Sequence, residues 1–311
     1  SIKQDSKITD LAEKSNSIDN KDNSANINRE YKSRLFSYLF GREETKQRTL
    51  SLYNSLSGTN YTNPDDITIT TIEDVIYMGM KNDVSFLITD TINFYEQQSS
   101  FNPNIPLRIF MYAGKAYAKF IEQRNLNLFS STLHKIPTPK CICFYNGLDK
   151  KEDKVVLKLS DAFADSSDPQ IEVTVTMLNV NYGHNKELME ACEPLKEYSW
   201  FVEEIRKNMD EEDEIGTAVD MALDSMPEEF VIRQFLLDNR AEVKDVLLTE
   251  YNEQKTMAAF RDEGFEEGRA DEKIETALRM IADGMLPLET IAKYADLPLE
   301  KVQSLAAHKT V

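Results

Sequence analysis

Cysteine is scarce in this sequence: Cys141, Cys143 and Cys192 are the three among 311 residues, and none has CxxC spacing. So sparse and odd a set argues against a disulfide scaffold and suits a reducing compartment, so we expect a cytoplasmic protein. Ten glycines and ten prolines exclude a collagen-like or Pro-rich low-complexity chain. No apolar run approaches ~20 residues, so we expect no membrane-spanning helix, and the polar N-terminus is unlike a signal peptide.

Basic residues are also in short supply, with 36 Lys and Arg against 54 Asp and Glu and a net charge of −18. Because neutralising phosphates requires Lys and Arg, this total argues against a nucleic-acid binder. The charge is uneven, however. Residues 1–150 carry 18 basic and 17 acidic side chains, a net of +1, and residues 151–311 carry 18 and 37, a net of −19. The N-terminal half can therefore still hold a nucleic-acid site, and the acidic runs after Met209 are typical of solvated helical faces.

Hydrophobic periodicity predicts an α/β (α+β) core followed by an all-helical C-terminal region. Helices are expected over 29–40, 46–56 and 107–124, and strands over 67–71, 83–88, 91–98, 140–145, 155–159 and 171–180. From Lys186 onward the pattern is helical. The expected divisions are a disordered leader (1–27), the core (28–185), a helical extension (186–260), a charged connector helix (261–274) and a small helix-turn-helix-like module (275–311).

The expected strands at 83–88 and 91–98 are two β-rich runs joined by a short turn. A turn at Thr89-Asp90 sets Asp83 opposite Glu96, and a turn one residue later sets it opposite Gln98. Either register puts Asp83 on the face that carries Glu96 and Gln98, because strand side chains alternate. Two carboxylates and a neighbouring amide are a candidate Mg²⁺ site, in which the amide would orient the attacking water. A solvent-facing strand with ordinary polar residues also satisfies this loose D-x12-E-x-Q pattern.

Longer strings around this hairpin are more specific. The stretches REYKSRLFSYLFG, LSLYNSLSGTNYTNPDDITITTIEDVIYMGMKNDVSFLI and INFYEQQSSFNPNIPLRIFMYAGKAY, with PTPKCICFYNG and VTMLNVNYGHNKELMEAC further on, resemble PD-(D/E)XK nuclease family transposases of the Rpn group of recombination-promoting nucleases. The resemblance covers roughly residues 29–265. It implies a restriction-endonuclease-like core with a mixed sheet flanked by helices. It also implies DNA cleavage that depends on Mg²⁺ or Mn²⁺ and serves recombination or a mobile element.

By this resemblance Asp83 and Glu96 are the metal-binding carboxylates, and Gln98 holds the catalytic position where many relatives outside the group carry Lys. Gln98 has no charge and can only hold water or a phosphate oxygen by hydrogen bonds. The family's first helix more often carries an acid where this chain has Ser33, and Glu30 is a weak substitute. An alternative interpretation is therefore a catalytically impaired DNA-binding, regulatory or interaction protein on the same fold.

A helix follows the hairpin and places Arg108 and Tyr112 four residues apart on one face. The resemblance suggests that they brace the site or touch a DNA phosphate, for which Arg is well suited. Equally, Arg108 can pair with an acidic neighbour while Tyr112 packs in the core. Lys115 and Lys119 continue the face and would add positive potential toward a DNA backbone.

The C-terminal string ETIAKYADLPLEKVQSLA resembles the helix-turn-helix appended to several members of the family. Its second helix offers Glu300, Lys301, Gln303 and Ser304 without a basic flank, which favours a packing or dimerisation module over a DNA reader. We therefore expect DNA as the principal partner and a homo-oligomer formed through the C-terminal helices.

Overall fold

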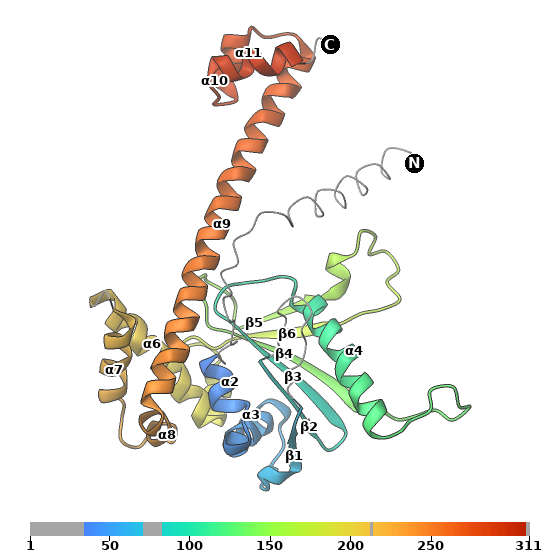
Figure 1. The fold of residues 1–311 in the computed structure, drawn as a ribbon, viewed down its shortest axis with the longest axis vertical. Coiled ribbons are helices and arrows are strands. Elements are labelled where there is room, and N and C mark those ends of the chain that lie inside the picture. The colour runs from blue at the N-terminus through green and yellow to red at the C-terminus, as the bar shows by residue number, and fades with distance from the viewer. Residues whose placement is uncertain (1–33, 71–82, 212–213, 309–311) are drawn as a thin grey trace, which may run out of the picture. The chain divides into compact units, whose positions relative to one another are not determined.

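The computed structural model describes residues 34–70, 83–211 and 214–308, apart from the side chains of 210, 211, 253, 254, 256–267 and 308. The leader predicted over 1–27, and the candidate acid Glu30 with its neighbour Ser33, lie outside the described residues. The described chain is a mixed α/β fold: a six-stranded sheet with helices on both faces, followed by a helical C-terminal part (Figure 1). The predicted mixed fold class is confirmed at this level.

The sheet has the strand order β1-β2-β3-β4-β6-β5. Neighbours β1/β2, β2/β3 and β6/β5 are antiparallel, whereas β3/β4 and β4/β6 are parallel. A parallel pair needs a long crossover, and helix α4 supplies it between β3 and β4. The strands are β1 (Ile67–Ile69), β2 (Val84–Ile88), β3 (Thr91–Gln98), β4 (Thr138–Tyr145), β5 (Lys154–Lys158) and β6 (Thr174–Asn179).

The β2–β3 hairpin turns at Thr89-Asp90. Ile88 pairs with Thr91 and Val84 with Tyr95. This is the first of the two registers that the sequence allowed, and continued by one residue it sets Asp83 opposite Glu96. Thr89 has φ of 48°, the left-handed conformation that a two-residue hairpin turn demands.

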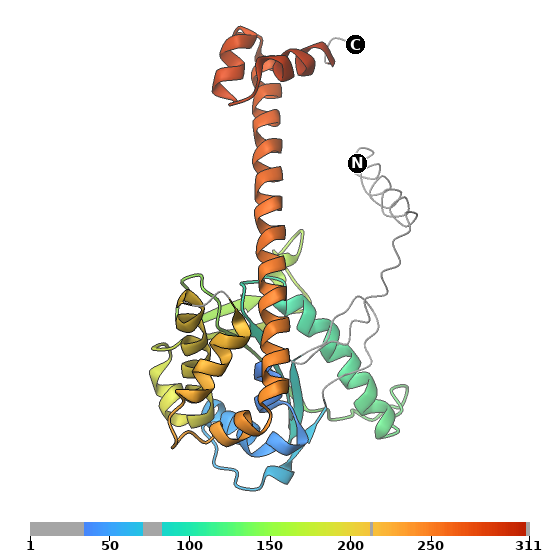
Figure 2. The same cartoon turned by 60° about the vertical axis from the view of Figure 1, so that its left-hand side comes forward.

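Alternation along the strands supplies two cores, one on each face of the sheet. On one face, Phe94 and its neighbours pack under α4 (Ile105–Gln123). On the other, Phe86, Tyr95 and Phe144 pack under α2 (Leu35–Phe40), α3 (Lys46–Ser57) and the helices that follow the sheet. Phe36 of α2 lies with its ring centroid 4.7 Å from that of Phe144. Figures 1 and 2 show α4 on one side of the sheet and α2 and α3 on the other.

From Lys186 onward the described chain is helical, as predicted. The longest helix, α9, crosses the boundaries predicted at 260/261 and 274/275 without a break and ends at Gly284, whose φ is +62°. The last turns of α9, α10 and α11 share a small core of their own. No helix in the described part of the chain is both long and apolar enough to cross a bilayer. The helices are α5 (Lys186–Ala191), α6 (Glu193–Glu211), α7 (Ile215–Asp224), α8 (Arg233–Asp238), α9 (Arg240–Asp283), α10 (Leu288–Tyr294) and α11 (Leu299–His308), with short 3-10 turns at Glu43–Thr45, Pro64–Asp66 and Leu159–Ala162.

Candidate functional site

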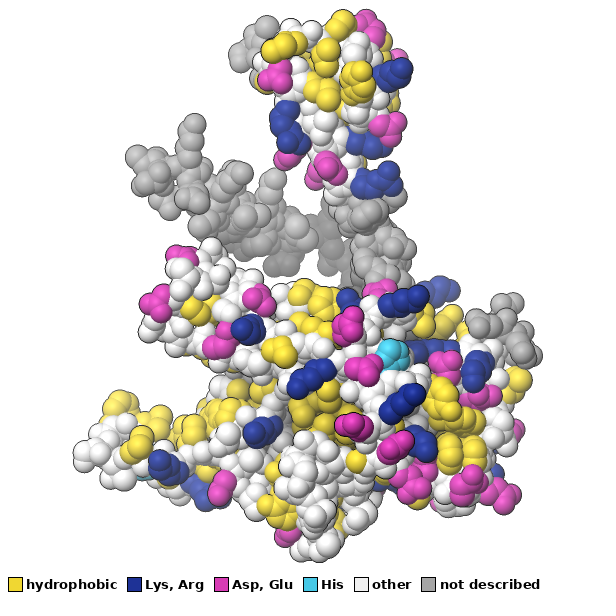
Figure 3. Space-filling view, turned by 180° about the vertical axis from the view of Figure 1, so that it is seen from behind, with side chains coloured by type: hydrophobic (Ala, Val, Ile, Leu, Met, Phe, Trp, Pro, Cys, Tyr) yellow, Lys and Arg dark blue, Asp and Glu magenta, His cyan; other side chains and the backbone are white. Residues whose placement is uncertain are grey.

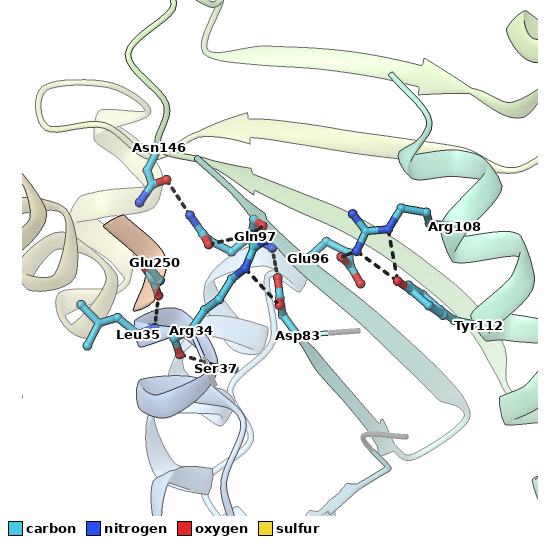
Figure 4. A network of polar contacts seen from close by, with 10 residues as sticks. All are labelled: Arg34, Leu35, Ser37, Asp83, Glu96, Gln97, Arg108, Tyr112, Asn146 and Glu250. Carbon is cyan, nitrogen blue, oxygen red and sulfur yellow. Dashed lines mark hydrogen bonds and ion pairs between the residues drawn. The ribbon is translucent and has the colours of Figure 1, made fainter. Parts of the chain in front are cut away.

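The open end of the β2–β3 hairpin brings two carboxylates together. Asp83 directly precedes β2 and Glu96 lies near the end of β3 (Figure 4). The backbone N–H of Gln97 donates to Asp83 Oδ2 at 2.6 Å, so this carboxylate closes the hairpin where the strand pairing stops. The other oxygen, Oδ1, lies 3.9 Å from Arg34 Nε. The structure therefore fixes Asp83 beside Glu96, as the predicted register requires.

Glu96 is the buried member of the pair, with 1% of its surface exposed. Burial, helped by the nearby charge of Asp83 and opposed by Arg108 and Arg34, raises its pKa from 4.5 to about 8. One of its oxygens, Oε1, is buried and has no hydrogen-bond partner among the described residues. A buried carboxylate with an unsatisfied oxygen is unstable as a lone anion, so this site favours either a proton or a cation.

Helix α4 supplies the cationic side chain that faces Glu96. Arg108 Nη2 donates to Glu96 Oε2 at 3.1 Å and to the hydroxyl of Tyr112 at 3.0 Å. Tyr112 is buried in the core under α4, and burial followed by the charge of Glu96 raises its pKa to about 12. Arg108 therefore pairs with an acidic neighbour and Tyr112 packs in the core, as one interpretation of the sequence expected. The acidic neighbour is the candidate site residue Glu96 itself, so the pair also lies beside the site.

Arg34 is a site residue that the sequence did not single out. Its guanidinium Nη1 donates to the carbonyl oxygen of Gln97 at 2.5 Å and to the Oε1 of the same residue at 3.2 Å. The side chain thereby spans from the start of α2 to β3 and reaches Asp83. Glu250 of α9 accepts the backbone N–H of Leu35 and so holds the first turn of α2 in place. The long helix α9 is thus part of the scaffold that positions Arg34.

Gln98 and Gln97 occupy opposite faces of β3 and have different partners. Gln98 Oε1 accepts the backbone N–H of Asn102 at 3.3 Å, a bond that fastens the loop leading into α4. Gln97 Nε2 donates to Asn146 Oδ1 at 2.6 Å on the other side of the sheet. Asn146, in turn, donates to the hydroxyl of Tyr198 at 2.9 Å. Gln97 is therefore a second site residue that the sequence did not single out.

The remaining candidates lie along α4. Lys115 and Lys119 are exposed, as expected for side chains meant to face solvent or a polyanion. They follow Arg108 at seven- and four-residue steps, so the three cations share one side of the helix. Arg108, Lys115 and Lys119 thus form a line of positive charge along α4 that leads away from the carboxylate pair.

The donor set fits one hard divalent cation such as Mg²⁺. This ion is usually held by one or two carboxylates together with waters, and Asp83 and Glu96 provide two. The Oε1 of Glu96, which has no hydrogen-bond partner among the residues that the structure describes, is the observation that favours a ligand at this position. In the part of the chain that the structure describes, no cluster of three or more His, Cys, Asp or Glu side chains could hold a metal.

No family model matches this chain, and neither a curated protein nor a solved structure does. The proposals below therefore depend on the geometry of the site and on the resemblance of its sequence strings.

Proposed function

We propose that the protein is a metal-dependent DNA endonuclease with a PD-(D/E)XK core, whose work is tied to recombination or to a mobile element. The observation that carries the proposal is the convergence of Asp83 and Glu96 from neighbouring strands, with one Glu96 oxygen buried and without a partner in the described part of the chain. The mixed sheet with helices on both faces and the resemblance of residues 29–265 to this nuclease group agree with it.

Asp83 and Glu96 would hold a Mg²⁺ or Mn²⁺ ion, which lowers the pKa of a bound water and offsets charge on the phosphoryl group. Arg108 keeps Glu96 oriented through its 3.1 Å bond and offers its other N–H groups to a phosphate oxygen. The Tyr112 hydroxyl fixes the guanidinium of Arg108 in that position. Gln98 sits at the end of β3, and its amide would hold the attacking water by a hydrogen bond.

The deciding experiment is cleavage of a supercoiled plasmid with Mg²⁺ or Mn²⁺ by the wild type and by Asp83→Ala. We expect nicked or linear product from the wild type and none from the variant, because Asp83 both binds the ion and closes the hairpin. Circular dichroism of both proteins serves as the folding control. Equal cleavage by the two proteins would show that a contaminating nuclease or another site is responsible.

A second candidate is a DNA-binding or regulatory protein that has the same site but lacks cleavage. The observation that favours it is charge balance: the guanidiniums of Arg34 and Arg108 lie beside the two carboxylates and partly supply the positive charge that an ion would bring. In that case the wild type binds the plasmid but does not cut it. Calorimetric titration with Mn²⁺ then gives the same result for the wild type and for Glu96→Ala.

We also propose self-association through the C-terminal helices. Met285, Leu286 and Tyr294 are exposed apolar side chains on or beside the small core that α9, α10 and α11 share. A chain ended after Tyr251 keeps the part of α9 that packs on the main core, including Val243 and Leu247. We expect it to sediment as a monomer and the full chain as an oligomer. An oligomer that survives this truncation would place the interface elsewhere.

A further inference from the structure

The segment from Phe101 to Leu148 differs from the rest of the chain in both charge and exposure. It holds six Lys and Arg side chains against the single acid Glu122, a net of +5 in a chain of −18. It also holds eight of the eighteen exposed large hydrophobic side chains found among the described residues. An exposed surface that is basic and apolar at once is typical of an interaction site. The eight are Leu107, Phe110, Met111, Leu128, Phe129, Leu133, Ile136 and Leu148.

The apolar side chains concentrate in the loop of residues 125–137, which we call the tip loop. Phe129 is fully exposed, at 101%, and Leu128 and Leu133 are also exposed. The loop follows α4 in Figure 1 and forms the lobe at the lower left of Figure 3, where hydrophobic side chains lie next to Lys and Arg. Exposure of such an apolar cluster to water is unfavourable, so a partner that covers it gains hydrophobic free energy.

Polar contacts hold the tip loop in shape. His134 Nε2 lies 2.9 Å from the carbonyl oxygen of Asn127, and the backbone N–H of Ser130 donates to the same oxygen at 3.1 Å. The hydroxyl of Tyr117 on α4 donates to the carbonyl of Pro137 at 2.7 Å and fastens the returning arm to the helix. The exposed ring of Phe129 is therefore presented by an organised turn, which lowers the entropy lost when a partner covers it.

A basic row on α4, consisting of Arg108, Lys115 and Lys119, connects the carboxylate pair with the tip loop. Eleven residues separate its ends, about 17 Å at ~1.5 Å per residue. One strand of a nucleic acid carries a phosphate every ~3.4 Å along its axis, so the row spans about five nucleotides. The row begins at Arg108, whose guanidinium lies against Glu96.

We propose that the basic row and the tip loop form one nucleic-acid contact surface, in which the lysines bind backbone phosphates and Phe129 stacks on a base or wedges between two bases. The choice of nucleic acid rests on the proposed nuclease function and on the charge of the surface. Exposed aromatic and apolar side chains beside cations are the means by which proteins hold unstacked bases. Lys135 in the tip loop and Arg124 beside it would also suit an anionic lipid surface, so vesicle binding is one outcome of the test, whereas the row on α4 leads from the tip loop toward the proposed site.

The test is binding of fluorescein-labelled oligonucleotides, single-stranded and duplex, in EDTA so that no cleavage occurs. Phe129→Ser removes the ring from a fully solvent-exposed position, and the pair Lys115→Glu with Lys119→Glu reverses the row. Matched controls are Val231→Ser, an exposed apolar side chain between α7 and α8, and Lys196→Glu, an exposed cation on α6 at the other face of the sheet.

We expect Phe129→Ser to weaken binding at least about tenfold, as loss of one base–aromatic stack does. The double variant Lys115→Glu/Lys119→Glu should weaken binding further. It should also make the negative slope of log K against log salt less steep by about 2, since two phosphate contacts are lost. Both controls should stay within about twofold of the wild type. The better-bound oligonucleotide distinguishes stacking on a single strand from wedging into a duplex.

Unchanged binding by Phe129→Ser overturns the proposal. So does Phe129-dependent binding to phosphatidylcholine–phosphatidylglycerol vesicles without Phe129-dependent binding to either oligonucleotide.

The plasmid assay separates this surface from the chemistry. If Asp83→Ala is inactive while Phe129→Ser binds and cleaves like the wild type, the nuclease proposal holds and the surface is wrong. If oligonucleotide binding depends on Phe129 while wild type and Asp83→Ala cleave equally, the surface holds and the proposed site is wrong.

Discussion

Glu96→Gln is expected to remove cleavage and, at alkaline pH, to make the fold more stable. The amide keeps the shape of the protonated acid but cannot ionise, so it cannot hold a divalent cation in the manner of a carboxylate. Metal assistance is worth several kcal/mol of barrier, and each ~1.4 kcal/mol is tenfold in rate, so cleavage should fall at least about 10³-fold. The variant is thus expected to lose activity but to gain stability, and the gain in stability has a separate cause.

The sign follows from the raised pKa of Glu96, which is about 8 in the fold against 4.5 for an ordinary Glu. Between these two pH values the folded chain retains a proton that the unfolded chain has lost, so wild-type stability falls as pH rises through this window. The full shift, at about 1.4 kcal/mol per unit, sets a ceiling of about 5 kcal/mol. We expect Glu96→Gln to match the wild type near pH 4.5 and to exceed it by about 3 kcal/mol at pH 8.5.

Urea unfolding in EDTA at several pH values measures this difference. Glu190→Gln is the matched control, because Glu190 is an exposed carboxylate on α5 and should behave like the wild type throughout. Added Mn²⁺ should stabilise the wild type more at pH 8.5 than at pH 6, since the ion competes with the proton for Glu96. A wild type and a Glu96→Gln variant that keep a constant stability difference across pH would show that Glu96 is not buried as described.

The hairpin could be predicted from sequence because its information is local. Two β-rich runs separated by two residues leave few registers, and alternation then places Asp83 and Glu96 on one face. The elements that complete the site are distant in sequence. Arg34 reaches Gln97 across 63 positions, and Glu250 binds the N–H of Leu35 across 215. No periodicity or spacing encodes such contacts, since they arise from how α2 and α9 pack on the sheet.

The fold shows the same division between local and distant information. Helix and strand types followed from periodicity, but the sheet order β4-β6-β5, in which the last strand lies between β4 and the edge strand β5, depends on pairing between distant segments. The charged stretch after Arg261 contains glycines, and α9 nevertheless passes through it as one helix. A glycine costs a helix only about 1 kcal/mol, and flanking residues with high helix propensity can offset that amount.

Arg108→Met is expected to destabilise the fold by about 2–3 kcal/mol near neutral pH, less than breaking a fully buried ion pair costs. Methionine keeps much of the apolar stem of Arg108 but removes both of its hydrogen-bond contacts, to Glu96 and to Tyr112. The value lies below the usual 3–5 kcal/mol because Glu96, with a pKa of about 8, is mostly protonated near neutral pH, and because 27% of the Arg108 side chain is exposed and water can partly replace it.

The cost of Arg108→Met should grow with pH. Arg108 opposes the rise in the pKa of Glu96, so its removal moves that pKa above about 8. Above pH 8 the wild type has ionised Glu96 and stops losing stability, whereas the variant continues to lose about 1.4 kcal/mol per pH unit. We therefore expect a deficit about 1 kcal/mol larger at pH 9 than at pH 6, measured by urea unfolding.

The double variant Arg108→Met with Glu96→Gln isolates the charge from the packing. If the loss in Arg108→Met comes from an uncompensated Glu96, neutralising Glu96 should recover the pH-dependent part and leave only the lost bonds to Tyr112 and residue 96. Additive effects of the two substitutions at pH 9 would mean that the two side chains do not interact. The 3.1 Å contact would then have no energetic role, and Arg108 would be free to act on phosphate alone.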